Sequence, residues 1–263
     1  MTWTTRQRSD YPGGIAGVRA GDGKPLVLIH GVGLNADSWG TQIDVLSGEF
    51  SVHALDLPGH GNSAPVADPA IVSDFSDALA AAFGAVEKPF FLAGHSLGAL
   101  IALDIAVRYP ETCRAVAALN AVHRRGPEAL AAVRARANAM SATEVNDPVP
   151  TLSRWYGDDL DGAAAQACRR WLTSVDPAAY KAAYTVFADA DSPADEAMTS
   201  LGCPALFLTG GLEPNSTPAM SEAMAAMVPD GRSVIVPGAA HMAMMTHATA
   251  VNRALSDFFG GAS

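Results

Sequence analysis

A serine flanked by two glycines stands where a strand pattern turns directly into a helix pattern. The pentapeptide Gly94-His95-Ser96-Leu97-Gly98 follows the apolar run Phe90–Ala93 and opens the helical pattern Leu97–Tyr109. This context is typical of the G-x-S-x-G nucleophile elbow, a turn so sharp that glycines must leave room for the backbone. The turn would place Ser96 at a helix N-terminus, whose amide groups favour a developing negative charge. We predict that Ser96 is a nucleophile, against the alternative of a glycine turn without a chemical role.

A histidine and a glutamate further along the chain could activate this serine. A serine hydroxyl is a weak nucleophile and needs a base that is oriented by an acid, in the chain order serine, acid, histidine for this kind of elbow. His241 follows the last strand pattern within Gly238-Ala-Ala-His241, whereas His247 falls inside a helical pattern and is typical of a surface or capping residue. Glu213 is the only carboxylate in the loop 209–218, which follows the preceding strand pattern. We predict His241 as the base and Glu213 as the acid.

Two further motifs complete a resemblance to a known family. His30-Gly31 follows the first core strand pattern, and Asp56-Leu-Pro-Gly-His-Gly-Asn-Ser63 follows the second. With the elbow and the Gly-x-x-His motif, these residues make the chain resemble the α/β-hydrolase family from about residue 26 to residue 259. One position departs from the family pattern, because the acid is more often aspartate and here it is Glu213.

The resemblance implies an activity and an oxyanion hole. In the family the amide after the nucleophile and an amide of the His-Gly loop bind the oxyanion, and here these are the N–H groups of Leu97 and Val32. The implied reaction is hydrolysis of an ester, thioester or lactone through an acyl-enzyme without a cofactor. The pattern is similar to 3-oxoadipate enol-lactonases, cofactor-free haloperoxidases and C–C-bond hydrolases, so a C–C hydrolase or a perhydrolase is the alternative. A small-ligand receptor that keeps the fold is an alternative of another class.

Three residues are candidates for binding the substrate. Arg124 opens the segment after the fourth core strand pattern and could hold a substrate carboxylate by a bidentate pair, although a solvated arginine is the simpler interpretation. His30 and Trp155 are the other two candidates, the first more typical of a positioning residue and the second of a packed aromatic side chain.

One motif points to a different chemistry. Gly31-Val-Gly33-Leu-Asn-Ala36 matches the dinucleotide-binding G-x-G-x-x-A fingerprint, and Asp56 lies 20 residues beyond Ala36, where an acid would meet a ribose. However, His30 stands where such a fold wants a small or apolar residue. A nucleotide site would also leave the elbow and His241 unexplained. We therefore expect no cofactor.

The elements that must position these residues follow an alternating order. Apolar runs without polar alternation are typical of strands buried on both faces. Six such runs occur, and they are Pro25–Ile29, Val52–Leu55, Phe90–Ala93, Val116–Leu119, Ala205–Leu208 and Ser233–Val236. Helical patterns follow most of them, at Trp39–Leu46, Asp74–Phe83, Leu97–Tyr109, Pro218–Met227 and Thr246–Phe259. The sequence therefore predicts an α/β fold with a mostly parallel sheet, preceded by edge strands at Trp3–Arg8 and Ile15–Arg19.

One stretch interrupts this alternation. Between about residues 122 and 202 the chain contains helical segments and clustered aromatics but no convincing strand pattern. Helices inserted there would cover the carboxyl ends of the strands, where open α/β sheets bind ligands. We predict a hydrolase core at residues 1–121 and 203–263 and a helical lid, or cap, at residues 122–202.

Composition limits the class of partner. The 263 residues are 49% hydrophobic and carry a net charge of −10, which opposes binding to nucleic acid or to an anionic membrane. The apolar run Ala78–Val86 is well short of the about 20 residues that span a membrane, and no signal-peptide pattern precedes the fold. Three widely spaced cysteines favour neither a disulfide framework nor a zinc site. We expect a cytoplasmic enzyme with a small-molecule substrate and no metal, and the sequence leaves a homo-oligomer open.

Overall fold

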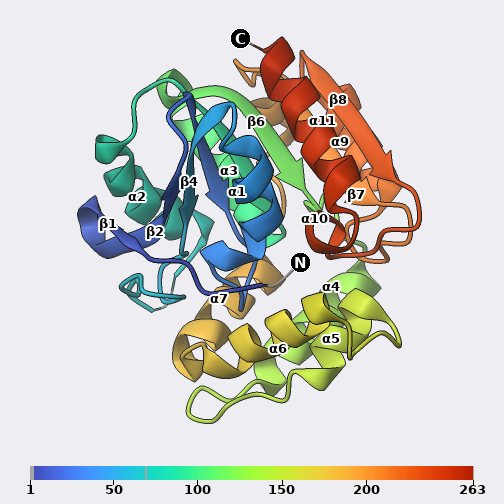
Figure 1. Ribbon diagram of the computed structural model, residues 1–263. Helices are drawn as coiled ribbons and strands as arrows, with labels where there is room; N and C mark the ends of the chain where they lie inside the picture. Colours follow the sequence, from blue (N-terminus) through green and yellow to red (C-terminus); the bar gives the residue numbers. More distant parts are fainter. Residues whose placement is uncertain (1–2, 69, 263) are drawn as a thin grey trace.

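The structure is a computed structural model that describes residues 3–68 and 70–262. Its centre is an eight-stranded sheet in the order β1-β2-β4-β3-β5-β6-β7-β8 (Figure 1). The strands are β1 Ser9–Tyr11, β2 Ile15–Ala20, β3 Lys24–Ile29, β4 Phe50–Leu55, β5 Phe90–His95, β6 Cys113–Leu119, β7 Ala205–Gly210 and β8 Gly231–Val236. The pairs from β4 through β8 are parallel, while β1 with β2 and β2 with β4 are antiparallel. The predicted α/β fold with a mostly parallel sheet is confirmed.

Helices cover the sheet and carry its crossovers. Those of the core are α1 Gly40–Leu46, α2 Val72–Ala82, α3 Leu97–Arg108, α9 Pro218–Met227, α10 Ala243–Thr246 and α11 Ala248–Gly261. Helix α3 packs on β5 and β6, and α1 packs against α11. Nearly all of α3 is buried, which explains its apolar sequence. In α9 the Thr217 side chain accepts a hydrogen bond from the Met220 N–H and Pro218 opens the helix, as the sequence predicted.

Between β6 and β7 the chain forms five helices, and we call residues 122–202 the insert. Its helices are α4 Pro127–Ala139, α5 Val149–Tyr156, α6 Ala163–Ser174, α7 Pro177–Asp189 and α8 Asp195–Thr199. Helix α4 packs on α7 and α5 on α6, and the insert lies below the core in the view of Figure 1. The division into a core and a lid stays a prediction.

Two expected elements differ from the structure. The edge strand at Trp3–Arg8 is wrong, because those residues form no helix or strand and β1 begins at Ser9. Arg6 and Arg8 instead direct their guanidinium groups to the carboxylates of Asp44 and Asp37, which holds this segment against the core. The last helical pattern is split, because the backbone of His247 (φ −124°, ψ 41°) separates α10 from α11. No helix of the described residues is long and apolar enough to cross a membrane.

Candidate active site

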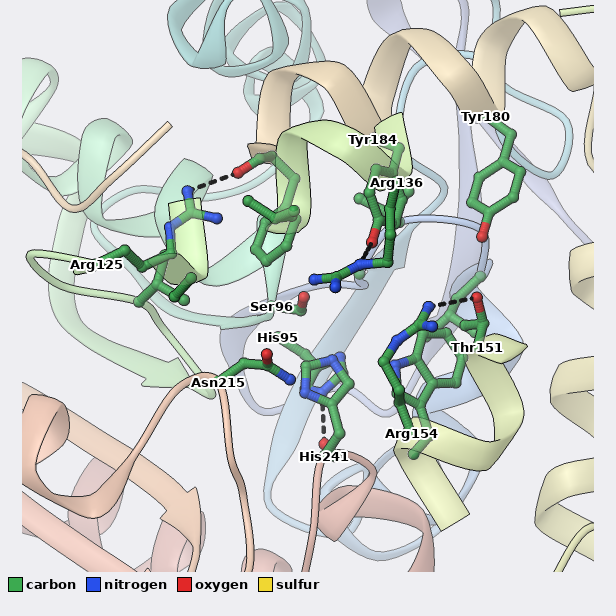
Figure 2. A pocket seen from close by; sticks show the side chains of 18 residues that line it. His95, Ser96, Arg125, Arg136, Thr151, Arg154, Tyr180, Tyr184, Asn215 and His241 are labelled. Carbon is green, nitrogen blue, oxygen red and sulfur yellow. Dashed lines mark hydrogen bonds between the residues drawn. The ribbon is translucent and has the colours of Figure 1, made fainter. Parts of the chain in front are cut away.

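Ser96 occupies a strained turn between β5 and α3. Its backbone has φ 56° and ψ −119°, a conformation that side chains rarely adopt. A Cβ atom on Gly94 would lie 1.9 Å from the Gly98 carbonyl oxygen, and one on Gly98 would lie 2.3 Å from the Ile29 carbonyl oxygen. Both glycines are therefore required by backbone packing. The turn projects Ser96 from the carboxyl end of the central strand into a cavity (Figure 2).

His241 and Glu213 form a buried pair at the same edge of the sheet. The Nδ1 atom of His241 is 2.8 Å from Oε2 of Glu213, and His241 lines the cavity together with Ser96. Among the described residues no hydrogen bond joins Ser96 to His241, and such bonds are often long in unliganded sites. The structure thus brings together the serine, the histidine and the glutamate that the sequence predicted.

The Glu213 carboxylate is held in its charged form. Burial raises its pKa, but His241 and the backbone N–H groups of Asn215 and Ser216 outweigh that effect and lower the pKa to about 2. Its Oε1 atom accepts hydrogen bonds from Asn215 at 2.7 Å and from Ser216 at 3.3 Å. The carboxylate is therefore ionised at neutral pH and fixes the orientation of the imidazole.

Asn120 is a site residue that the sequence reasoning missed. Directly after β6, it adopts φ 55° and is buried. Its Nδ2 atom donates to Thr209 Oγ1 at 3.1 Å and to Glu213 Oε2 at 3.5 Å. The signal that could have revealed it is a polar residue directly after an apolar strand pattern. The predicted acid follows the next strand pattern along the chain, which pairs with this one in the sheet.

The loop after β3 lies against Ser96. A Cβ atom on Gly31 would lie 3.1 Å from the Cβ of Ser96, so this backbone has the close approach that an oxyanion hole needs. Val32 also lines the cavity, and Leu97 opens α3. Within the described part of the chain, the N–H groups of Val32 and Leu97 have no hydrogen-bond acceptor.

Two neutral histidines fix this loop. His30 Nε2 accepts from the Leu57 N–H at 2.8 Å, and His60 Nε2 accepts from the Gly33 N–H at 3.0 Å. Burial lowers the pKa of both imidazoles, which keeps these nitrogens free to accept. His30 is fully buried and does not line the cavity, so the structure does not support it as a substrate-binding residue.

Asp56 holds the same loop and explains the dinucleotide-like motif. Its carboxylate accepts hydrogen bonds from the N–H groups of Ala36 and Asn62 and forms an ion pair with Arg8. The side chain is fully buried. An acid engaged in this way ties two loops together and has no position from which to meet a ribose.

Three arginines of the insert line the cavity opposite Ser96. They are Arg125, Arg136 and Arg154, and among the residues that the structure describes no Asp or Glu lines the cavity with them (Figure 2). Arg136 Nε donates to the Tyr184 hydroxyl at 3.1 Å, and Arg154 Nη2 donates to Thr151 Oγ1 at 2.9 Å. Burial lowers the pKa of Arg154, and the neighbouring Arg136 adds to that effect. The cavity wall therefore concentrates three positive charges, while the nearest carboxylates to Arg125, those of Asp191 and Asp189, lie outside the lining.

The Arg125 side chain also forms hydrogen bonds within the insert. Its Nη2 atom donates to the carbonyl oxygens of Phe187 and Ala190 at the end of α7. Its Nε atom is buried and has no hydrogen-bond partner among the described residues. One donor of this cavity-lining arginine is thus unpaired.

Arg124 does not reach the cavity. Its side chain is 66% exposed and pairs with Asp195, while its backbone N–H donates to Asp191 Oδ1 at 3.0 Å. The structure therefore does not support Arg124 as a substrate-binding residue, and its neighbour Arg125 lines the cavity instead. Arg124 occupies a turn with a φ of 51°.

The third predicted substrate-binding residue does line the cavity. Trp155, on α5, stacks on the His241 imidazole with ring centroids 5.5 Å apart and an interplanar angle of 23°. His247 lies outside the cavity and contacts the Thr246 hydroxyl. Over residues 3–68 and 70–262, no cluster of three or more His, Cys, Asp or Glu side chains could hold a metal ion.

Comparison with known proteins finds relatives of this chain by sequence and by fold. Residues 26–254 match the family described as "Alpha/beta hydrolase family". The (E)-2-((N-methylformamido)methylene)succinate hydrolase of Acinetobacter baylyi is 37% identical over 237 residues, which are 89% of this chain and 90% of that protein. A malate-bound esterase from Thermogutta terrifontis shares the fold with a TM-score of 0.84 and 24% identity, over 98% of this chain and 99% of the other. The enol-lactonase of Burkholderia xenovorans gives a TM-score of 0.82 and 21% identity, over 97% and 100%.

Proposed function

Because this chain belongs to the alpha/beta hydrolase family and is a hydrolase, we propose that it cleaves a small acyl substrate that carries at least one carboxylate, through Ser96, His241 and Glu213. One observation carries the proposal. A single cavity is lined by the serine at the elbow, by His241, which Glu213 orients from behind, and by three arginines, with no carboxylate of the described residues in the lining. The insert then serves as a lid that supplies the cationic wall.

The first half of the reaction forms an acyl-enzyme. His241 takes the proton of the Ser96 hydroxyl through Nε2 as the oxygen attacks the substrate carbonyl carbon. The resulting oxyanion is bound by the N–H groups of Val32 and Leu97, which have no acceptor among the described residues. Removing one such donor costs about 3–4 kcal/mol of transition-state stabilisation in a comparable hydrolase. The tetrahedral intermediate collapses when His241 returns the proton to the leaving group.

The second half releases the acid. Water gives a proton to His241 and attacks the acyl carbon, and Ser96 leaves with that proton. Glu213 stays ionised throughout, because the hydrogen bonds of Asn215 and Ser216 stabilise its charge. It keeps Nδ1 of His241 protonated, so that Nε2 is free to act as the base.

The arginines select the charge of the substrate. Arg136 and Arg154 each use one donor on a neutral hydroxyl, and Arg125 retains an unpaired Nε atom, so all three have donors available for an anion. The relative at 37% identity is named a hydrolase of a substituted succinate, which has two carboxylates. The scissile bond is that of an ester, thioester or lactone, or an amide such as the one in that relative's substrate name.

A matched pair of substrates tests this proposal. Mono-p-nitrophenyl succinate carries a carboxylate where p-nitrophenyl 4-methylpentanoate has an isopropyl group of similar shape. We expect a fluorophosphonate probe to label Ser96 and the succinate ester to have the higher kcat/KM. An N-acylated aminomethylene succinate assayed alongside tests the amide bond.

Three results would count against it. Equal kcat/KM for the two esters would contradict the proposal that the substrate carries a carboxylate. A protein that neither reacts with the probe nor turns over any of these substrates would contradict the serine mechanism. Labelling with ligand binding but no turnover would favour the receptor alternative.

A further inference from the structure

The imidazole of His241 is enclosed on three sides. Glu213 contacts Nδ1, and His95 lies beside the ring with centroids 4.9 Å apart and an interplanar angle of 57°. The indole of Trp155 covers a face of the imidazole, nearly parallel to it at 23°. Glu213 and His95 come from the core, whereas Trp155 comes from α5 of the insert. Both the core and the insert therefore contribute side chains that contact the predicted base.

The groups around His241 differ in how they affect a positive charge on its ring. The Glu213 carboxylate favours the imidazolium, and the cavity arginines Arg125, Arg136 and Arg154 oppose it. Burial lowers the pKa of His95 to about 3, so this neighbour is neutral and donates through Nε2 to the His241 carbonyl oxygen.

The two tyrosines that line the cavity carry no charge that could stabilise the imidazolium, whereas Trp155 offers an aromatic face to it. Burial raises the pKa of Tyr180 to about 12, so its hydroxyl is neutral, and the Tyr184 hydroxyl accepts from Arg136. An indole face attracts a cation within about 6 Å of its centroid, more strongly than any other side-chain ring. The 5.5 Å separation from Trp155 lies within that limit.

We propose that Trp155 is a positioning residue through which the insert supports the base, by holding the plane of the His241 ring and stabilising its imidazolium form. The inference rests on the proposed function, in which His241 is positively charged in both transition states. Proton transfer would then be efficient only with the insert in place.

An NMR titration tests the inference without relying on turnover. The His241 imidazole signal, assigned by its loss in His241→Gln, is followed against pH in the wild type, Trp155→Leu and Trp155→Phe. Leucine keeps the position apolar but removes the aromatic face. We expect the His241 pKa to fall by about 0.4–1.5 units in Trp155→Leu and by less in Trp155→Phe. The matched control is Trp171→Leu, a buried tryptophan on α6 that does not line this cavity, which should leave the His241 pKa unchanged.

Kinetics separate positioning from substrate contact. With p-nitrophenyl acetate, which is too small to need the cavity wall, Trp155→Leu should lower kcat about 2- to 30-fold with little change in KM, and should move the acid limb of kcat/KM to lower pH. An unchanged His241 pKa in both Trp155 variants would overturn the inference, as would a loss confined to KM. If Trp155→Leu fails to fold, the smaller shift expected for Trp155→Phe decides the question. A wild type that neither labels nor turns over would instead refute the proposed function, and the NMR titration would still report on the stacking.

Discussion

The core side and the insert side of the cavity differ in how far their polar side chains are hydrogen-bonded within the protein. On the core side, the side chains that orient the base and the loop after β3 are hydrogen-bonded inside the protein: Glu213 accepts from His241, Asn215 and Ser216, and His30 and His60 each accept from a loop amide. The N–H groups of Val32 and Leu97 have no acceptor among the described residues. On the insert side, Arg136 and Arg154 make one side-chain hydrogen bond each and keep their other donors. The core half is fixed before a substrate arrives, and the insert half is left incomplete.

The difference follows from what each half must do. Stabilising a transition state requires dipoles that are already oriented and do not reorganise during the reaction. Recognising an anion requires donors that are unpaired until the anion binds, because a donor already engaged gains little. We therefore expect substitutions of the core residues to lower kcat, and substitutions of the cavity arginines of the insert to raise KM for charged substrates.

The strongest test removes the nucleophile from the core half. Ser96→Ala should lower kcat about 10⁴- to 10⁶-fold, because the attacking oxygen is lost. Its melting temperature should not fall, since only a hydroxyl is deleted from the strained turn. His241→Ala should be similarly inactive, whereas His247→Ala should retain most activity, as measured by p-nitrophenyl ester hydrolysis. A folded Ser96→Ala protein of near wild-type activity would rule out the proposed mechanism.

The next effect concerns the acid. Glu213→Gln should lower kcat by about 10⁴-fold, because a neutral amide can favour the wrong imidazole tautomer, as in the analogous change in a serine protease. Glu213→Asp should fall between Gln and the wild type, because the shorter side chain does not reach His241 from a loop built around glutamate. Wild-type kcat/KM in Glu213→Gln would mean that another group orients the base.

In the insert half the expected effect is smaller and depends on substrate charge. Arg154→Ala should raise KM for mono-p-nitrophenyl succinate about 10- to 150-fold, the cost of one charge-assisted hydrogen bond, and leave the neutral ester nearly unchanged. Arg124→Ala is the matched control, because that exposed arginine pairs with Asp195 outside the cavity, and should change neither substrate. An equal loss on both substrates in Arg154→Ala would indicate a role in folding the insert.

The smallest effect should come from a phenol that orients an arginine. Tyr184→Phe removes the hydroxyl that accepts from Arg136 Nε. We expect KM for the succinate ester to change about 2- to 10-fold, because Arg136 loses a hydrogen bond that orients it but keeps its charge, and kcat to be unchanged. A change in kcat of the same size for both esters would show that the two halves are coupled through Tyr184.

Much of the core could be predicted because its signals are local. An apolar run, two glycines and a helix pattern around Ser96 define the elbow within a few residues, and the family resemblance that these motifs suggested is confirmed. The strand patterns were correct to within a few residues, since strands buried on both faces must be apolar throughout. The N-terminal edge strand was wrong because the arginines that hold that segment pair with carboxylates far along the chain.

The insert could not be predicted to the same depth. Arg134 and Arg136 are two residues apart on α4, yet the first pairs with Asp189 on the surface and the second lines the cavity. The sequence of α4 does not distinguish them, because arginine and alanine alternate along residues 134–137. Packing of α4 on α7 decides which arginine faces inward.

Local patterns were enough to predict the sheet, the elbow and the choice of Ser96, His241 and Glu213, because backbone crowding and chain order restrict those positions. The packing of separate elements brings Arg125, Arg136 and Arg154 into the cavity wall, Asn120 to the acid and Trp155 onto the base. Those contacts join residues from separate elements, and their geometry depends on how helices pack rather than on any local pattern. Periodicity shows that a helix has a buried face, but the partner of each polar side chain is set only when the helices meet.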